Sequence, residues 1–187
     1  MKSVKSFVVP LILVWIVAKL LFYFSGEARV GFEVLIFTTM FFILVIECAS
    51  LWLKYKTITL NDSNFLDDIK TVVRAASGFI LGIMAFTLLY YTVIDSKVLG
   101  NMVEARVENA EKLVLDVEGF EAWKAGNPTI APDFTPEDYI EKERKTAETV
   151  TNPLLIVGGG LLVWVLFAVF NGVFVTILFR KVLLKQT

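Results

Sequence analysis

The chain has 187 residues, of which 56% are apolar and 20% charged, with a formal net charge of -1. Its mean hydropathy of +0.68 is too high for an ordinary soluble domain and indicates a membrane protein. The single cysteine cannot form an internal disulfide, and the absence of histidine removes the usual metal ligand, haem ligand and proton shuttle. The composition therefore disfavours metalloenzymes, cytochromes and Ser-His-Asp hydrolases, and we expect no metal and no cofactor.

Two apolar runs follow each other at the start of the chain, over residues of about 7–24 and 32–53. Each is about long enough to cross ~30 Å of hydrocarbon as a helix. Because Lys2 and Lys5 precede the first run, a secretory signal peptide is the alternative. The run is long for a signal core and contains Lys19, so we expect a retained span. The short turn near Gly26 predicts an antiparallel hairpin of the two spans.

Ionisable side chains interrupt these two spans, and in hydrocarbon such side chains need partners. The turn near Gly26 places Lys19 roughly level with Glu33. We expect either an ion pair between them or a Lys19 that reaches the headgroups while Glu33 stays at the interface. Glu47 lies deeper, and its interpretation as a proton- or cation-handling carboxylate competes with that of a polar tie to Lys5, Lys54 or a neighbouring helix. We favour the polar tie, because no chain of further titratable groups accompanies it.

Two further spans are predicted, over residues of about 71–94 and 153–179. Each carries small residues at helical spacing, which let helices approach closely in lipid. The residues predicted for helix packing are Gly78, Gly82, Ala168 and Gly172. The simplest expectation is that the two sets pack against each other, and homodimerisation through one of them is the alternative. Asn171 is expected to form an interhelical hydrogen bond, with substrate binding as the less favoured role.

The charged residues separate by side. The segments on the side of the termini carry nine basic residues and only three acidic ones, whereas residues 95–152 carry thirteen acidic residues against seven basic ones, a net charge of -6. Basic residues concentrate in the cytoplasmic loops of membrane proteins. The pattern predicts cytoplasmic termini and an insert, residues 95–152, on the opposite side.

The first half of this insert is expected to form a helix from Lys97 to Glu121, continuous with the third span. Apolar residues recur along it at alternating four- and three-residue steps, which is the period of one helix face. The members of this predicted docking stripe are Val103, Val107, Ala110, Val114 and Val117. Such a stripe requires an apolar partner.

The second half of the insert predicts another helix, which starts with Thr135 as N-cap, Pro136 at the first position and an acid at the third. The two arms would form an antiparallel helical hairpin. The second arm is highly charged and has too few apolar residues to cover the first. The remaining stripe is therefore expected to contact the first two spans, another copy or another protein.

The layout resembles a bacterial four-span membrane family, that of domain of unknown function 4199. The similarity is carried by four spans, a short first loop, an acidic lead into the third span, and Ile94-Asp95-Ser96-Lys97-Val98-Leu99 at its outer end. In that family an isoleucine-aspartate-proline-like turn often closes the third span, and Ser96 occupies the proline position here. The resemblance implies a small bacterial inner-membrane protein, multi-pass, and it transfers no catalytic residue.

The sequence thus predicts an all-α membrane protein with four transmembrane helices and an extracytoplasmic helical hairpin between the third and fourth. The favoured function is a non-catalytic accessory or scaffold subunit of a membrane complex, with residues 95–152 as its docking or oligomerisation element. A small oligomeric transporter or ion-conducting protein that uses Glu47 and Asn171 is the alternative. The expected partners are the lipid bilayer and a protein partner or second copy. No basic patch supports a nucleic acid.

Overall fold

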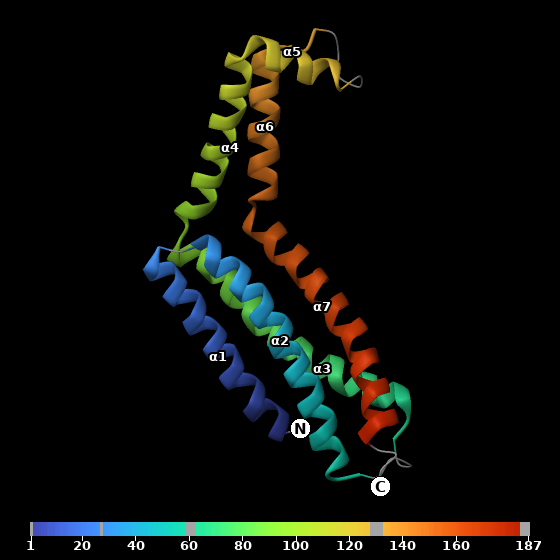
Figure 1. Cartoon of the computed structure of the whole chain (residues 1–187). Helices are drawn as coiled ribbons and strands as arrows, with labels where there is room; N and C mark the ends of the chain where they lie inside the picture. The colour runs from blue at the N-terminus through green and yellow to red at the C-terminus, as the bar shows by residue number, and fades with distance from the viewer. Residues whose placement is uncertain (1, 27, 59–62, 128–132, 184–187) are drawn as a thin grey trace. The chain divides into compact units, whose positions relative to one another are not determined.

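The computed structural model describes residues 2–26, 28–58, 63–127 and 133–183. Within these ranges the chain is helical, and no described residue lies in a β-strand, so the predicted all-α class is confirmed (Figure 1). Short π-helical segments, η2 (Tyr90–Ile94) and η3 (Phe179–Leu183), follow α3 and α7. The α-helices are α1 (Lys2–Ser25), α2 (Ala28–Tyr55), α3 (Phe65–Leu89), α4 (Lys97–Leu115), α5 (Val117–Ala125), α6 (Pro136–Val150) and α7 (Pro153–Leu178).

Four helical segments are long and apolar enough to cross a membrane, as the sequence predicted. They are Ser6–Ser25, Glu33–Tyr55, Phe65–Ile94 and Pro153–Val182. Even the shortest, of 20 residues, reaches about 30 Å at 1.5 Å per residue, the thickness of the hydrocarbon layer. These four segments are consistent with a multi-pass membrane protein.

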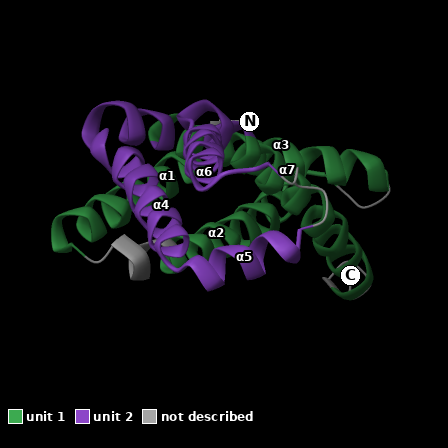
Figure 2. Ribbon diagram, turned by 90° about the horizontal axis from the view of Figure 1, so that it is seen from above, with its two compact units in different colours: residues 1–86, 159–187 green, residues 87–158 purple. Residues whose placement is uncertain are grey.

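The chain divides into two compact units, coloured separately in Figure 2. Unit 1 comprises Met1–Phe86 and Gly159–Thr187, and therefore holds α1, α2 and most of α3 and α7. Unit 2 is Thr87–Gly158, which includes η2, α4, α5 and α6. Each unit has its own internal packing.

In unit 1, α1 and α2 lie side by side as the predicted hairpin (Figure 1). Gly26 makes this turn with a φ of 75°, in the left-handed region that only glycine adopts at little cost. The indole Nε1 of Trp15 donates a hydrogen bond of 2.9 Å to the Thr39 hydroxyl and ties the two helices together. One helical turn after Thr39, the Phe42 ring meets the Phe79 ring edge to face, so α3 packs against α2 as well.

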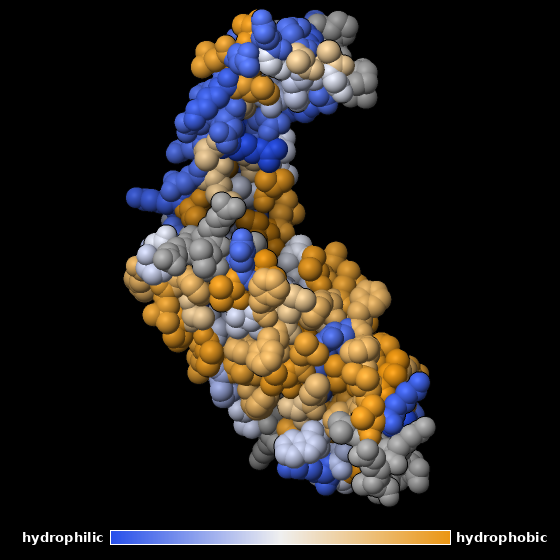
Figure 3. Space-filling model, viewed as in Figure 1, coloured by the Kyte–Doolittle hydropathy of each residue, from blue (hydrophilic) through white to orange (hydrophobic). Residues whose placement is uncertain are grey.

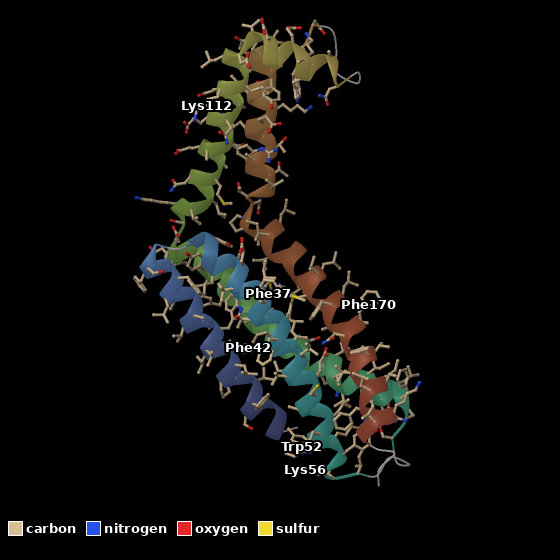
Figure 4. All side chains as sticks on the ribbon, in the orientation of Figure 1. Phe37, Phe42, Trp52, Lys56, Lys112 and Phe170 are labelled. Carbon is tan, nitrogen blue, oxygen red and sulfur yellow. The ribbon has the colours of Figure 1, made fainter. Side chains whose placement is uncertain are left out.

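The face of unit 1 seen in Figure 3 is largely apolar, as its orange atoms show. Phe37 and Phe170 are exposed and point away from the helices that carry them (Figure 4). Such a surface suits contact with lipid, because lipid tails are as apolar as the side chains themselves. At the end of α2, Lys56 Nζ lies 3.8 Å from the centroid of the Trp52 ring, a cation–aromatic pair typical of a membrane interface.

In unit 2, α4 and α6 lie side by side, so the two arms of the insert pair as predicted (Figure 1). Arg106 of α4 and Glu143 of α6 form an ion pair of 2.7 Å. The expected cap of the second arm is confirmed: the Thr135 hydroxyl accepts from the Asp138 amide, and the Asp138 carboxylate accepts from the Thr135 amide. The hydrogen bonds from the Thr135 backbone and side chain hold the pKa of Asp138 below its ordinary value.

The first arm differs from the prediction. We expected one helix from Lys97 to Glu121, continuous with the third span, but the helix breaks twice. It is interrupted at Asp95 and Ser96, after η2, and again at Asp116. Asp116 caps α5, since its carboxylate accepts a hydrogen bond of 3.1 Å from the Gly119 amide. The Asp116 side-chain cap thus ends α4 before Glu121, where the predicted helix ends.

Candidate functional site

The most unusual group in unit 1 is the carboxylate of Glu47, which α2 places against α7. Its side chain is 0% exposed. The Asn171 amide nitrogen donates a hydrogen bond of 2.7 Å to Glu47 Oε2. The structure therefore joins two of the predicted intramembrane polar residues, from segments more than a hundred positions apart, in one interhelical contact. This is the geometry of a polar tie to a neighbouring helix.

Two buried side-chain oxygens of unit 1 lack hydrogen-bond partners within the described residues. They are Glu47 Oε1 and Thr176 Oγ1, the latter on a side chain that is also fully buried. Most buried polar atoms in folded proteins are paired, so an orphan of this kind requires an explanation. Thr176 lies one helical turn after Gly172 and thus on the same face of α7.

Gly172 permits the close approach of α7 to α2 and α3. A Cβ atom at this position would lie 2.8 Å from Val72 Cγ2 and 3.5 Å from Glu47 Oε1. The first distance is shorter than real Cβ contacts, so Val72 would have to move. The predicted helix-packing role of Gly172 thus has a specific geometric basis.

Substitution of Gly172 by alanine is expected to destabilise unit 1 by about 1–3 kcal/mol, because overpacking displaces a well-packed valine. Gly159 on the same helix is the matched control, since its Cβ would meet nothing within 4 Å. Alanine at that position is expected to be neutral or stabilising, by up to about 1 kcal/mol from helix propensity. Thermal unfolding of both variants in detergent measures the difference. Equal midpoints for the two variants would contradict the close approach.

The other predicted packing residues contact different surfaces. Ala168 is buried on α7, whereas Gly82 of α3 faces α1, where its Cβ would lie 2.5 Å from Ile12 Cδ1. Gly78 is exposed, and its Cβ would meet nothing within 4 Å. At these glycines the two sets of small residues do not meet each other as we expected. The spacing of the small residues predicts which face of each helix carries them, but not which helix packs against that face.

The remaining predicted polar residues lie apart from Glu47. Lys19 Nζ lies 6.0 Å from the centroid of the Trp15 ring on the same helix, and Glu33 is exposed at the start of the second span. Their ion pair stays a prediction. The side chain of Lys5 lies outside the described residues, and the predicted polar tie between Lys5 and Glu47 therefore stays a prediction.

A second polar cluster in unit 1, around Asp68, was not predicted as a site. Asp68 is 0% exposed on α3 and forms ion pairs with Lys54 Nζ at 2.7 Å and Arg180 Nε at 2.6 Å. Its carboxylate also accepts hydrogen bonds from the hydroxyls of Tyr55, at 2.6 Å, and Ser63, at 2.9 Å. Arg180 Nη2 donates to the Ser63 carbonyl as well, at 2.6 Å. One buried anion thus holds the ends of α2, α3 and α7 together.

The predicted docking stripe of unit 2 is mostly covered by the same chain. Val107 and Ala110 are buried, and Val103 and Val114 are half-buried. The helix break at Asp116 removes Val117 from this face and leaves it 71% exposed on α5.

The cover comes from a small core that includes α5 as well as α6. Its buried members are Ala110, Phe120 and Tyr139, and the Trp123 ring stacks on Phe120 at 5.8 Å and lies 4.4 Å from the Tyr139 ring. Burial among these groups raises the pKa of the Tyr139 phenol, and the nearby Glu143 carboxylate adds to the effect. The expectation that the stripe needs an outside partner loses most of its basis, because the chain supplies the partner itself.

Unit 2 has an exposed apolar tip between α4 and α5, in addition to single exposed apolar side chains such as Met102 and Val150. The tip consists of Leu115, which is 81% exposed, and Val117, on either side of Asp116. It is smaller than the predicted stripe.

No protein-family model, curated protein or solved structure matches this chain. The resemblance to the family of domain of unknown function 4199 therefore stays a prediction. Within the described ranges, no three histidine, cysteine, aspartate or glutamate side chains come together as a metal site would require.

Proposed function

We propose that this chain is a non-catalytic integral membrane protein that serves as an accessory or scaffold subunit of a membrane complex. Four membrane-capable segments and the apolar surface of unit 1 support the membrane placement. The polar groups of unit 1 connect its helices to one another, which favours a structural role for most of them.

In this proposal both termini lie in the cytoplasm of a bacterium and residues 95–152 lie on the periplasmic side of the inner membrane. The nine basic residues of the terminal side support this orientation, and so does the insert's net charge of -6. The observation that carries the docking role is the exposed tip, whose two large apolar side chains, Leu115 and Val117, are 81% and 71% exposed.

The proposed occupant of this tip is a different protein with an apolar centre and a basic rim. The acidic excess of the insert repels a second copy of itself and anionic lipid alike, whereas it attracts a basic surface. An apolar centre with a complementary charged rim is the usual composition of a transient protein interface. Electrostatic attraction of this kind weakens as salt increases.

The test places a photo-crosslinking amino acid at Val117 in the full-length protein and irradiates native membranes. The control is the same amino acid at Asn109, which is exposed on α4 outside the tip. We expect one protein of a different sequence to crosslink at position 117 but not at 109. Its complex with the chain should have a defined stoichiometry in mild detergent, and the crosslink should decrease with increasing salt.

Two substitutions with the same change in charge complete this test. For these, the photo-crosslinking amino acid is placed at Leu115. Val117→Glu should abolish the crosslink from that position, whereas Asn109→Glu should leave it intact. A native mass corresponding to a lone monomer would contradict the subunit function. Crosslinking between two copies of this chain, or equal labelling at positions 109 and 117, would contradict the heteromeric partner.

The second candidate is a small oligomeric transporter or ion-conducting protein. The buried contact of Glu47 with Asn171 favours it, because an ionisable residue within a membrane segment frequently marks a path for ions or protons. Four spans would form such a path by oligomerising. The native mass measured in the same experiment tests this requirement.

A further inference from the structure

Glu47 has surroundings that do not suit an ionised carboxylate. The side chain is fully buried, and Gly172 and the Val72 and Val73 methyl groups lie next to it. One amide N–H, that of Asn171, reaches Oε2, and Oε1 has no hydrogen-bond partner within the described part of the chain. A buried carboxylate is stable only when its charge is paired and its lone pairs are satisfied.

The neighbouring helices offer no compensating charge among the described residues. On α7, the residues that meet Glu47, Asn171 and Gly172, are neutral, and so is Thr176 on the same face as Gly172. The side chains that α3 presents there, Val72 and Val73, are apolar.

The other polar and charged groups of these helices are engaged elsewhere. On α2 itself, Cys48 is exposed, and Ser50 donates to the Glu47 backbone carbonyl at 2.8 Å. Along α2, α3 and α7, Lys54 and Arg180 are both paired with Asp68, and Arg74, close to Val72 and Val73 on α3, is exposed. On α1, Lys19 lies beside Trp15, and the Lys5 side chain is outside the described residues.

A proton fits this site better than a metal cation does. Cations such as Ca²⁺ and Mg²⁺ require about six oxygen ligands, whereas the orphaned side-chain oxygens here are Glu47 Oε1 and Thr176 Oγ1. The close contact at Gly172 also leaves little room. A proton needs a single acceptor atom, and Oε1 is the oxygen that the Asn171 amide leaves unoccupied. Protonation there removes the buried charge and keeps the hydrogen bond to Oε2.

We propose that Glu47 holds a proton on Oε1 between α2 and α7, so that unit 1 carries a neutral carboxylic acid within its membrane-capable segments. Asn171 orients the carboxyl group through Oε2. The ligand of the site is the proton itself. This inference does not depend on the docking function of unit 2.

The test is infrared spectroscopy of the full-length protein in phosphatidylcholine vesicles. A protonated carboxylic acid has a C=O stretching band that a carboxylate lacks. We expect this band at neutral pH and its loss at strongly alkaline pH, with the carboxylate band appearing in its place. Glu47→Gln should lack the band. Glu33→Gln, which removes an exposed carboxyl from the same helix, should retain it.

A second variant secures the assignment even if Glu47→Gln does not fold. Asn171→Leu removes the N–H that donates to Oε2 and should shift the frequency of the same band. A carboxylate band from Glu47 at neutral pH would overturn the proposal. So would loss of the acid band on addition of sodium chloride at constant pH, because the site would then bind a metal cation. An acid band that Asn171→Leu leaves unshifted would overturn the proposed position of the proton.

Discussion

Replacement of Asp68 by asparagine is expected to lower the free energy of unfolding of unit 1 by about 3 kcal/mol. Removal of one partner of a buried ion pair costs roughly 3–5 kcal/mol, because the remaining charge stays buried without compensation. The Asp68 side chain is 0% exposed, and those of Lys54 and Arg180 are only 17% and 24% exposed. Water therefore solvates the remaining positive charges only in part. The Asp68 carboxylate accepts four hydrogen bonds. In asparagine, one of the two acceptor oxygens is replaced by an NH₂ group, which is itself a donor and would face these donors.

Thermal unfolding of the purified protein in mild detergent measures this effect. A loss of about 3 kcal/mol corresponds to a decrease of roughly 6–12 °C in the unfolding midpoint for a chain of this size. Asp67→Asn is the matched control, because the neighbouring carboxylate is exposed and its pair with Lys70 is longer, at 3.7 Å. An exposed ion pair contributes about 0–1 kcal/mol, so this control should unfold close to the wild type.

A double-mutant cycle separates the ion pair from other effects of the substitution. With Arg180→Gln added to Asp68→Asn, the loss should be less than the sum of the two single losses by about 1 kcal/mol or more. Strictly additive losses, or equal midpoints for the Asp67 and Asp68 variants, would show that the network does not hold the helix ends together.

The sequence predicted the four long helices because their signal is local. Each is a continuous apolar run of membrane length, and hydropathy depends on nothing outside the run. The turn at Gly26 and the cap at Thr135 were predictable for the same reason, since each depends on a few adjacent residues. Identification of Glu47 and Asn171 as intramembrane polar residues also required only their position within apolar runs.

The breaks in the first arm of the insert were not predicted, because two local rules competed there. The apolar period continues through Asp116 to Val117, but the Asp116 side chain caps a new helix at that point. An aspartate three residues before a glycine was the available signal. Once α5 is separated from α4, Phe120 and Trp123 can turn back and cover the stripe that seemed to lack a partner. An error of a few residues in one helix boundary thus led to an overestimate of the exposed apolar surface.

The neighbours of the polar groups could not be derived from the sequence at all. Asp68 was assigned only to the side of the termini, and nothing local distinguishes it from Asp67, which is exposed. The rotation of α3 about its own axis buries the Asp68 carboxylate and exposes that of Asp67. This rotation is set by the packing of Val72 against Leu51 and Val175. Thr176 was not predicted as a site residue, although its hydroxyl is one of the two buried side-chain oxygens that lack a hydrogen-bond partner within the described residues.

Substitution of Phe120 by alanine is the corresponding test of unit 2, with an expected loss of about 3 kcal/mol or more. Removal of a buried phenylalanine side chain costs roughly 3–5 kcal/mol from lost transfer energy and the remaining cavity. Phe120 is buried, and its ring contacts both Trp123 and Tyr139. Phe120 is the buried member that α5 contributes to this core, where it packs with Ala110 of α4 and Tyr139 of α6, so its removal leaves a cavity against both helices.

Hydrogen–deuterium exchange of the full-length protein locates this loss. Backbone amides of α4 and α6 should exchange about 100-fold faster in Phe120→Ala, since each 1.4 kcal/mol changes an opening equilibrium tenfold. Amides of α1 and α2 should be unaffected. Leu115→Ala is the control within the tip, because this side chain is 81% exposed and its removal should cost no more than about 0.5 kcal/mol. The two variants also separate stability from docking: Leu115→Ala should weaken the crosslink at Val117 while α4 and α6 stay protected. Equal exchange in both variants would mean that the Phe120 core does not stabilise the apolar stripe of α4. The whole of that stripe would then be the candidate surface for an outside partner.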